Sequence, residues 1–187
     1  MRILLVGPPG AGKGTQAVKI AEKLGIPHIS TGDIFRSQIA AGTDLGKQAQ
    51  EFMNAGQLVP SSVTNGMVAA RLAEADTAAG FLLDGYPRNL DQIEALDTVL
   101  VPADRQLQVV LELTAETDVV VARLLQRAVE QGRADDTEEV IRKRLEVYAD
   151  ETAPIIAVYA DRGILTQVDG IGSVEEVTQR IFEALSI

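Results

Sequence analysis

The sequence predicts an α/β protein in which a parallel sheet is covered by helices on both faces. Short apolar runs of strand length recur along the chain, and segments with helical periodicity lie between them. Strands that alternate with helices pair in parallel, because each helix carries the chain back along a face of the sheet. The expected strands cover residues 3–6, 27–29, 81–83, 109–113 and 164–168.

Signals at the helix ends support this alternation. A helix over residues 14–24 is expected to end at Gly25, because glycine readily adopts the left-handed conformation that follows many helices. The tetrapeptides "STGD" at 30–33 and "SVEE" at 173–176 each place a serine three residues before an acid, which is typical of a capping box. Pro154 interrupts a later helical run and so separates two helices.

Two segments depart from the simple alternation. Residues 30–80 lack a strand pattern and are broken by Gly56 and Pro60, so we expect a helical insertion between the second and third strands. Residues 128–136, "AVEQGRADD", form a short polar break between two helical patterns. The chain has the length of one ordinary domain, and we expect a single domain, 1–187, that contains both segments.

The composition excludes several classes of function. The chain carries 17 Lys and Arg against 27 Asp and Glu, and this net charge of −10 argues against broad binding to nucleic acid. No apolar stretch approaches the ~18 residues that span a bilayer. The absence of cysteine excludes disulfides and thiolate zinc sites, and is compatible with a reducing compartment. We therefore expect a cytoplasmic, soluble protein without membrane contact or structural zinc, whose cations gather in one anionic site.

A phosphate-binding loop follows the first predicted strand. The stretch "GPPGAGKGT" places four residues between Gly7 and Gly12, followed by Lys13, which is the Walker A spacing. Backbone N–H groups, the start of a helix and the lysine charge together bind phosphates. Gly14 stands where the common pattern has Ser or Thr, so Thr15 is the hydroxyl expected near the phosphates or Mg²⁺. The loop residues expected to bind a nucleoside triphosphate are Gly10, Ala11, Gly12, Lys13, Gly14 and Thr15.

A dinucleotide-binding fingerprint is the alternative for these glycines. Gly10 and Gly12 fit its first two positions, and Asp33 lies about 20 residues further on, where that motif has an acid. The third glycine position is Thr15, however, and a lysine in the tight turn is foreign to the motif. The triphosphate loop is the better interpretation.

Asp84 is the candidate for the metal. It closes the apolar strand "FLLD", and a Walker B acid at the carboxyl end of a strand contacts the nucleotide's Mg²⁺ or its waters. The alternative is an ordinary turn residue before Gly85. Beside a phosphate-binding loop, we favour the metal role.

Arginines outside this loop indicate a second anionic group. Each one taken alone has a solvated surface charge as the alternative, and Arg123 and Arg127 are spaced like an i,i+4 helical pair. A switch GTPase is excluded, because no Asn is followed by Lys and the guanine-reading Asn-Lys-x-Asp motif is therefore absent. The arginines concerned are Arg36, Arg88, Arg123, Arg127, Arg133 and Arg144.

From residue 1 to the C-terminus, the chain resembles the adenylate kinases, which are nucleoside monophosphate kinases built on such a loop. The set of landmarks is far more specific than any one member. The landmarks are "GPPGAGKGT" (7–15), "ISTGDIFR" (29–36), "GQLVP" (56–60), "FLLDGYPRNLDQ" (81–92), "RADDTEEVIRKRL" (133–145), "YADETAP" (148–154) and "VDG" (168–170).

The resemblance implies the P-loop kinase fold and the reaction of ATP with AMP to give two ADP, with Mg²⁺. Residues 30–59 would form the AMP-binding insertion, and 128–136 the lid. Only five residues separate Arg127 from Arg133, which indicates the short-lid form without zinc. We expect a monomer whose partners are ATP, AMP and ADP.

The resemblance also implies roles for particular residues. Gln92 lies one helical turn after Arg88, and its amide can both donate to and accept from an adenine edge. The AMP site would comprise Thr31, Arg36, Gln57, Leu58, Val59, Gly85, Tyr86, Pro87, Arg88 and Gln92, with Arg133 and Arg144 reaching across both phosphate chains. Arg127 and Gly172 would bind ATP with the loop. The catalytic set would be Lys13, Arg88, Arg123, Arg133 and Arg144.

Two alternatives remain open from the sequence. A pyrimidine (UMP/CMP) monophosphate kinase would share this fold and differ in the acceptor base. A non-catalytic nucleotide sensor would keep the loop and dispense with the acceptor arginines, so Arg36 and Arg88 speak against it. His28, the one histidine, is interpreted as structural, because phosphoryl transfer through a loose transition state needs little from a base.

Overall fold

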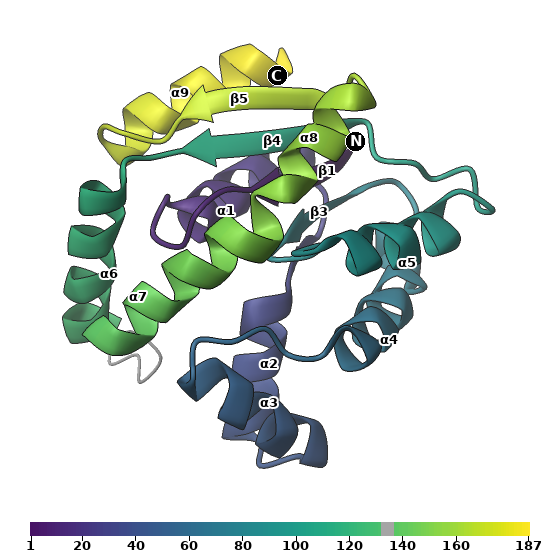
Figure 1. Cartoon of the computed structure of the whole chain (residues 1–187). Coiled ribbons are helices and arrows are strands. Elements are labelled where there is room, and N and C mark those ends of the chain that lie inside the picture. The colour runs from purple at the N-terminus through teal and green to yellow at the C-terminus, as the bar shows by residue number, and fades with distance from the viewer. Residues whose placement is uncertain (132–136) are drawn as a thin grey trace.

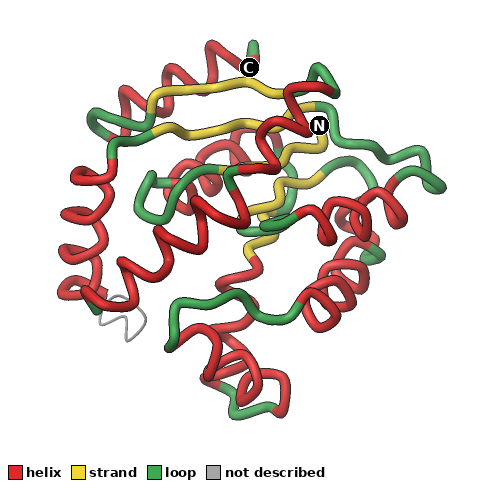
Figure 2. Tube along the Cα trace, viewed as in Figure 1, coloured by secondary structure: helices red, strands yellow, loops and turns green. Residues whose placement is uncertain are grey.

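The computed structural model describes residues 1–131 and 137–187. Within them, five parallel strands form one sheet in the order β2-β3-β1-β4-β5, and helices cover both faces (Figures 1 and 2). The predicted α/β class is confirmed, and each predicted apolar run forms a strand. The strands are β1 (Arg2–Val6), β2 (His28–Ser30), β3 (Phe81–Asp84), β4 (Val109–Thr114) and β5 (Leu165–Asp169).

The central strand β1 explains why the strands have continuous apolar sequences. It pairs with β3 on one side and β4 on the other, so that Leu5 lies opposite Asp84 and Leu111. Successive side chains of a strand enter opposite faces, and both faces are covered here. Leu4 accordingly packs in one core and Leu5 in the other. Neither face of β1 is available to water.

The two cores have different helical covers. Helices α4 (Ser61–Leu72), α5 (Leu90–Leu100) and α8 (Pro154–Asp161) pack on one face of the sheet. Helices α1 (Lys13–Leu24) and α9 (Val174–Leu185) pack on the other. Fully buried side chains such as Ile20, Ile181, Leu96 and Tyr159 fill these layers.

The helix ends follow the sequence signals. Gly25 ends α1 in the left-handed conformation, and Ser173 and Glu176 form a complete capping box at the start of α9. At the start of α2 (Thr31–Ala40), the hydroxyl of Ser30 accepts from the backbone N–H of Asp33. These local signals therefore predicted the end of α1 and the starts of α2 and α9, although α2 has only the serine half of the expected capping box.

The segment between β2 and β3 is helical, as expected. It contains α2, α3 (Asp44–Asn54), α4 and the short 3₁₀ turn η1 (Ala75–Thr77). Helices α2 and α3 project away from the sheet at the bottom of Figure 1. They enclose a small core of their own, which consists of Phe35, Ala49 and Val59.

The predicted polar break is partly wrong. Helix α6 (Thr117–Gln131) continues through residues 128–131, which were expected to lie in the break. Ala, Glu and Gln are good helix formers, and the Gln126 amide donates to the Glu130 carboxylate one turn later. Residues 132–136, and with them Arg133, lie outside the described residues.

The run after the break divides where Pro154 predicts. Helix α7 (Glu138–Val147) leads into a π-helical turn, η2 (Tyr148–Thr152), and Pro154 is the first residue of α8. Among the described helices, none is long and apolar enough to cross a membrane.

Candidate functional site

The phosphate-binding loop connects β1 to α1 at the carboxyl edge of the sheet, toward which the arrowheads of β4 and β5 point in Figure 1. Two of its glycines are required by close approach. Gly10 has φ of +84°, and a Cβ there would lie 2.7 Å from the carbonyl oxygen of Val120. A Cβ on Gly7 would collide with the carbonyl oxygen of Leu113. The loop is thus pressed against β4 and α6.

Lys13 is the first residue of α1 and folds back over the loop. Its Nζ donates to the carbonyl oxygens of Gly7 at 2.7 Å and Pro8 at 2.9 Å. Burial, with lesser contributions from nearby arginines, lowers the pKa of Lys13 to about 8, although Asp84 opposes this shift. A phosphate would restore the charge by giving the ammonium an anionic partner.

Asp84 ends β3 beside the first turn of α1. It is 8% exposed, and a Cβ on Gly14 would lie 3.9 Å from its Oδ2 atom. The glycine at this position therefore leaves open space between the helix and the carboxylate. With the exposed Thr15 one residue on, these are hard oxygen donors, which fit a magnesium ion that arrives with a triphosphate.

His28, which the sequence analysis interpreted as structural, lies next to the carboxylate of Asp84. Its Nε2 atom is 3.6 Å from Asp84 Oδ2, is buried, and has no hydrogen-bond partner among the described residues. In the sheet, His28 lies opposite Leu82, two residues before Asp84, so the two side chains are neighbours on the same face of adjacent strands.

A first cavity lies between the insertion and the carboxyl end of β3. Its wall is tied together at Gly85, whose carbonyl oxygen accepts from Thr31 Oγ1 at 2.9 Å and from Arg88 Nε at 2.7 Å. Burial and the neighbouring Arg144 lower the pKa of Arg88 to about 10. The predicted AMP residues that line this cavity are Thr31, Arg36, Gln57, Leu58, Val59, Gly85, Pro87, Arg88, Gln92 and Arg144.

Gln92 enters this cavity with its amide already in use. It is 2% exposed; its Oε1 accepts from the N–H of Arg88 at 2.8 Å, and its Nε2 donates to Ser61 Oγ at 3.3 Å. These bonds use one of the two amide hydrogens and one oxygen lone pair. The other hydrogen and lone pair have no part in them.

Tyr86 differs from the other predicted residues. Its side chain is buried in the core and lines neither of the cavities described here. Its hydroxyl lies 2.9 Å from Asn65 Oδ1 and 3.2 Å from the carbonyl oxygen of Gln92. The ring that follows Gly85 turns inward, and its hydroxyl joins α4 to α5.

The sequence analysis missed several residues of this cavity. They come from helix faces or from the segment after α7, where the landmark "YADETAP" was given no role in the site. Only the amphipathic spacing of Phe35, one turn after Thr31, offered a hint. The missed residues are Phe35, Met53, Thr64, Tyr148 and Thr152.

A second, larger cleft follows the phosphate-binding loop toward α6 and the loop before α9. Arg123 crosses it, because its guanidinium donates to the carbonyl oxygens of Gly170 at 3.0 Å and Gly172 at 3.4 Å. Arg127 lies on the same wall one turn later. The predicted residues that line the cleft are Gly10, Ala11, Gly12, Lys13, Gly14, Thr15, Asp84, Arg123, Arg127 and Gly172.

The cavity and the cleft meet at a group of cations. Lys13, Arg36, Arg88 and Arg144 line both of them. Four positive side chains at one junction, in a chain of net charge −10, match two phosphate chains that approach end to end.

Comparison with known proteins identifies the family. A family model described as adenylate kinase matches residues 5–164. The adenylate kinase of Kocuria rhizophila is 59% identical over 184 residues, which cover 98% of each chain. That of Thermobifida fusca is 56% identical over 99% of this chain, and one from Stenotrophomonas maltophilia is 52% identical over the same share. The chain belongs to the adenylate kinase family.

Membership of the adenylate kinases confirms the resemblance seen in the sequence. The protein is a nucleotide-binding enzyme, an ATP:AMP phosphotransferase, since the likeness to these kinases extends over nearly the full length of both chains. The pyrimidine kinase and the non-catalytic sensor are thereby set aside.

Proposed function

We propose that the larger cleft binds ATP, that the cavity beside the insertion binds AMP, and that the phosphoryl group passes where they meet. The observation that carries this assignment is the junction lined from both sides by Lys13, Arg36, Arg88 and Arg144. Phosphoryl transfer through a loose transition state depends on positioning and charge rather than on a base. A shared set of cations supplies both.

On the acceptor side, Arg36 and Arg88 bind the AMP phosphate, and residues 57–59 with Thr31 enclose the base. Gln92 contributes its second amide hydrogen, which donates to a ring nitrogen of adenine. Its burial and its bonds to Arg88 and Ser61 support this role, because they hold the amide in one orientation. Gly85 and Pro87 shape the same wall.

On the donor side, the amides of residues 10–15 cradle the ATP phosphates. Arg123, Arg127 and the backbone at Gly172 line the cleft further out. Asp84 holds Mg²⁺ through a bound water, and this ion neutralises charge on the β- and γ-phosphates when it is present. We assign no structural zinc.

The insertion at 30–59 and the lid predicted at 128–136 close over the nucleotides and exclude water. Such closure is established for adenylate kinases as a family. Arg133 is assigned to the lid and to the phosphates by the sequence resemblance alone. We also propose a cytoplasmic monomer, which has access to the cellular nucleotide pool; gel filtration at several concentrations tests the oligomeric state.

The acceptor assignment predicts a strong preference for AMP. With saturating MgATP, a coupled assay should give turnover with AMP at least about tenfold faster than with UMP or CMP, because a buried amide that is left unpaired by the wrong base costs ~1–3 kcal/mol. UMP or CMP used as well as AMP would contradict the role of Gln92.

A pair of variants tests the division between donor and acceptor. Arg88→Ala should lower kcat/KM for AMP by roughly 10³-fold, the smaller loss typical of a phosphoryl-transfer arginine, and leave the dissociation constant of ATP nearly unchanged. Lys13→Ala should abolish turnover with every acceptor, because it removes charge from the transferring group. Equal losses of ATP and AMP binding in folded Arg88→Ala would contradict this assignment.

A further inference from the structure

The motif "YADETAP" at 148–154 was given no function in the sequence analysis, although its Tyr148 and Thr152 line the cavity beside the insertion. It forms the π-helical turn η2, in which the N–H of Ala153 donates to the carbonyl oxygen of Tyr148 at 2.7 Å. A π turn holds one residue more than an α turn and is frequent at functional sites. Here Thr152 is 7% exposed, whereas its neighbour Glu151 faces solvent.

The buried hydroxyl of Thr152 is directed at the acceptor arginine. Its Oγ1 atom donates to the carbonyl oxygen of Arg88 at 2.8 Å, although 64 residues separate the two in sequence. The N–H of Arg88 donates to Gln92 Oε1 at 2.8 Å. Both polar groups of the Arg88 backbone are therefore held by side chains, one from the next helical turn and one from a distant segment.

Restraint of the Arg88 backbone matters because several cations lie close together in this site. Burial, followed by repulsion from the nearby guanidinium of Arg144, lowers the pKa of Arg88. A carboxylate partner would hold Arg88 but would also neutralise the charge that phosphate binding uses. A neutral hydroxyl bonded to the backbone restrains the residue and leaves its guanidinium charged.

We propose that Thr152 is a positioning residue that holds Arg88 in place for the AMP phosphate. This proposal rests on the proposed role of Arg88. Because α7 leads directly into η2, the hydroxyl also ties the backbone of Arg88 to the helix that carries Arg144. The hydrogen bond from Thr152 to Arg88 thus connects the segments that carry Arg88 and Arg144, the two arginines assigned to the phosphates.

The variant Thr152→Val keeps the shape of the side chain and removes the hydroxyl. We expect kcat/KM for AMP to fall by about tenfold, since a misplacement of ~1 Å at a phosphoryl-transfer site costs up to ~10²-fold. The KM for ATP should change by less than about twofold, because no bond in the donor cleft is lost. Thr152→Ser should restore the wild-type value.

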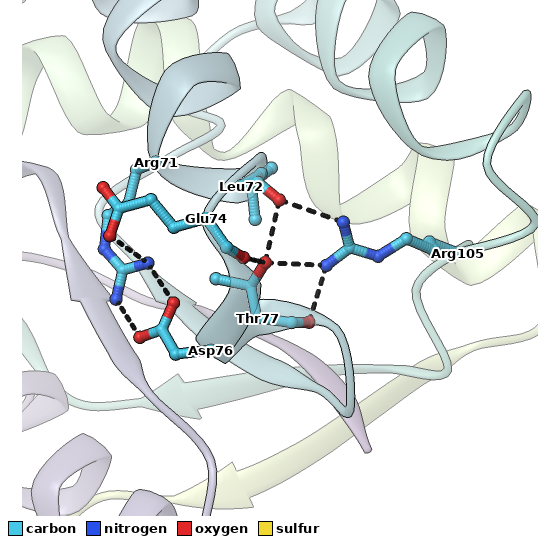
Figure 3. Close-up of polar contacts among 6 residues, drawn as sticks. All are labelled: Arg71, Leu72, Glu74, Asp76, Thr77 and Arg105. Carbon is cyan, nitrogen blue, oxygen red and sulfur yellow. Dashed lines mark hydrogen bonds and ion pairs between the residues drawn. The ribbon is translucent and has the colours of Figure 1, made fainter.

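Thr77→Val is the matched control. Thr77 is fully buried, and its hydroxyl donates to the carbonyl oxygens of Leu72 and Glu74, both at 2.8 Å (Figure 3). It lines neither nucleotide cavity. Both valine variants lose a buried hydroxyl-to-backbone bond and should melt at lower temperature, but only Thr152→Val should alter the use of AMP.

The outcomes are distinct. A kcat/KM for AMP that is unchanged in Thr152→Val, or a KM for ATP that rises by as much as kcat/KM for AMP falls, would overturn the positioning role, as would a Thr152→Ser variant no better than valine. If Arg88→Ala itself leaves AMP use intact, the assignment of the AMP site fails and this inference fails with it. A strong Arg88→Ala effect without a Thr152→Val effect refutes the inference alone.

Discussion

At the scale of single residues, the site is a balance between burial and repulsion. Lys13 and Arg88 both have lowered pKa values, because each is buried close to other cations. Lys13 compensates by donating to the carbonyl oxygens of its own loop. The energetic cost of assembling these charges without a ligand is recovered when phosphates arrive, which favours tight binding of polyanions.

This balance predicts that ATP binding weakens as pH rises above 8. The free enzyme loses the Lys13 proton near pH 8, whereas bound triphosphate raises this pKa, so binding takes up a proton above that pH. Isothermal titration from pH 7 to about 9.5 should show affinity falling toward tenfold per pH unit at the alkaline end. In Lys13→Arg the affinity should be nearly independent of pH, and a flat wild-type profile would contradict the explanation.

The lowered pKa of Lys13 also determines how its contribution to the free energy of unfolding changes with pH. Between pH 8 and the unfolded value of 10.5, the unfolded chain carries more of the Lys13 proton than the folded protein. The contribution of Lys13 to the free energy of unfolding therefore rises with pH across this window and is smallest below pH 8.

The positions of site residues were predictable where they follow from local sequence. Lys13 and Asp84 stand at fixed places relative to a strand, so the motif alone located them. Tyr86 and Thr152 show what local sequence does not predict. The direction in which each side chain points depends on packing between segments that are distant in sequence. A tyrosine within a site motif was turned into the core, and a threonine outside any assigned site was turned toward Arg88.

At the scale of elements, two arginines bind near the end of α4, one to backbone carbonyl oxygens and the other to carboxylates (Figure 3). Arg105 comes from the loop before β4, and its guanidinium donates to the carbonyl oxygens of Leu72 at 2.9 Å and Thr77 at 2.6 Å. It also lies 5.6 Å from the centroid of the Phe81 ring. Arg71 pairs instead with the exposed Asp76, through bonds of 2.8 and 2.7 Å.

These partners predict unequal contributions to stability. Arg105→Met should lower the free energy of unfolding by about 2 kcal/mol, because carbonyl groups at the end of α4 lose a charged donor. Arg71→Met should cost much less, because solvent screens an exposed ion pair. Urea unfolding measures both, and KM values should be unchanged in each variant. Equal losses would contradict the anchoring role of Arg105.

Element boundaries were predictable to different degrees. Caps are local, so Gly25 and Ser173 were assigned correctly. The end of α6 was predicted too early. The glycine and charged residues of 132–136 suggested a break from residue 128, but the helix-forming residues before them extend the helix to Gln131. The π turn η2 was also missed: Pro154 signals an interruption but does not determine its geometry.

At the scale of the whole molecule, the parallel sheet explains why the loop motifs converge. The segments after β1, β2, β3 and β5 leave the same edge, because parallel strands all end there. The phosphate-binding loop, Thr31, the residues after Asp84 and Gly172 therefore become neighbours. The chain as a whole carries a net charge of −10, whereas Lys13, Arg36, Arg88 and Arg144 gather in the cavities at this edge.

This architecture predicts that metal serves the reaction and not the fold. The chain has no cysteine, and within residues 1–131 and 137–187 no three metal-ligating side chains form a cluster suited to an ion. A structural metal would contribute directly to folding, so its removal would lower the melting temperature. EDTA should therefore stop turnover while the melting temperature of the nucleotide-free protein stays the same.

Mg²⁺ with ATP provides the positive control for this measurement. At nucleotide concentrations ~100 times the dissociation constant, binding should stabilise the fold by about 2.7 kcal/mol, and EDTA should remove the part of this gain that depends on the metal. Metal analysis of the purified protein completes the test. Stoichiometric zinc, or a melting temperature that EDTA lowers without nucleotide, would show that a metal stabilises the fold and would refute the prediction.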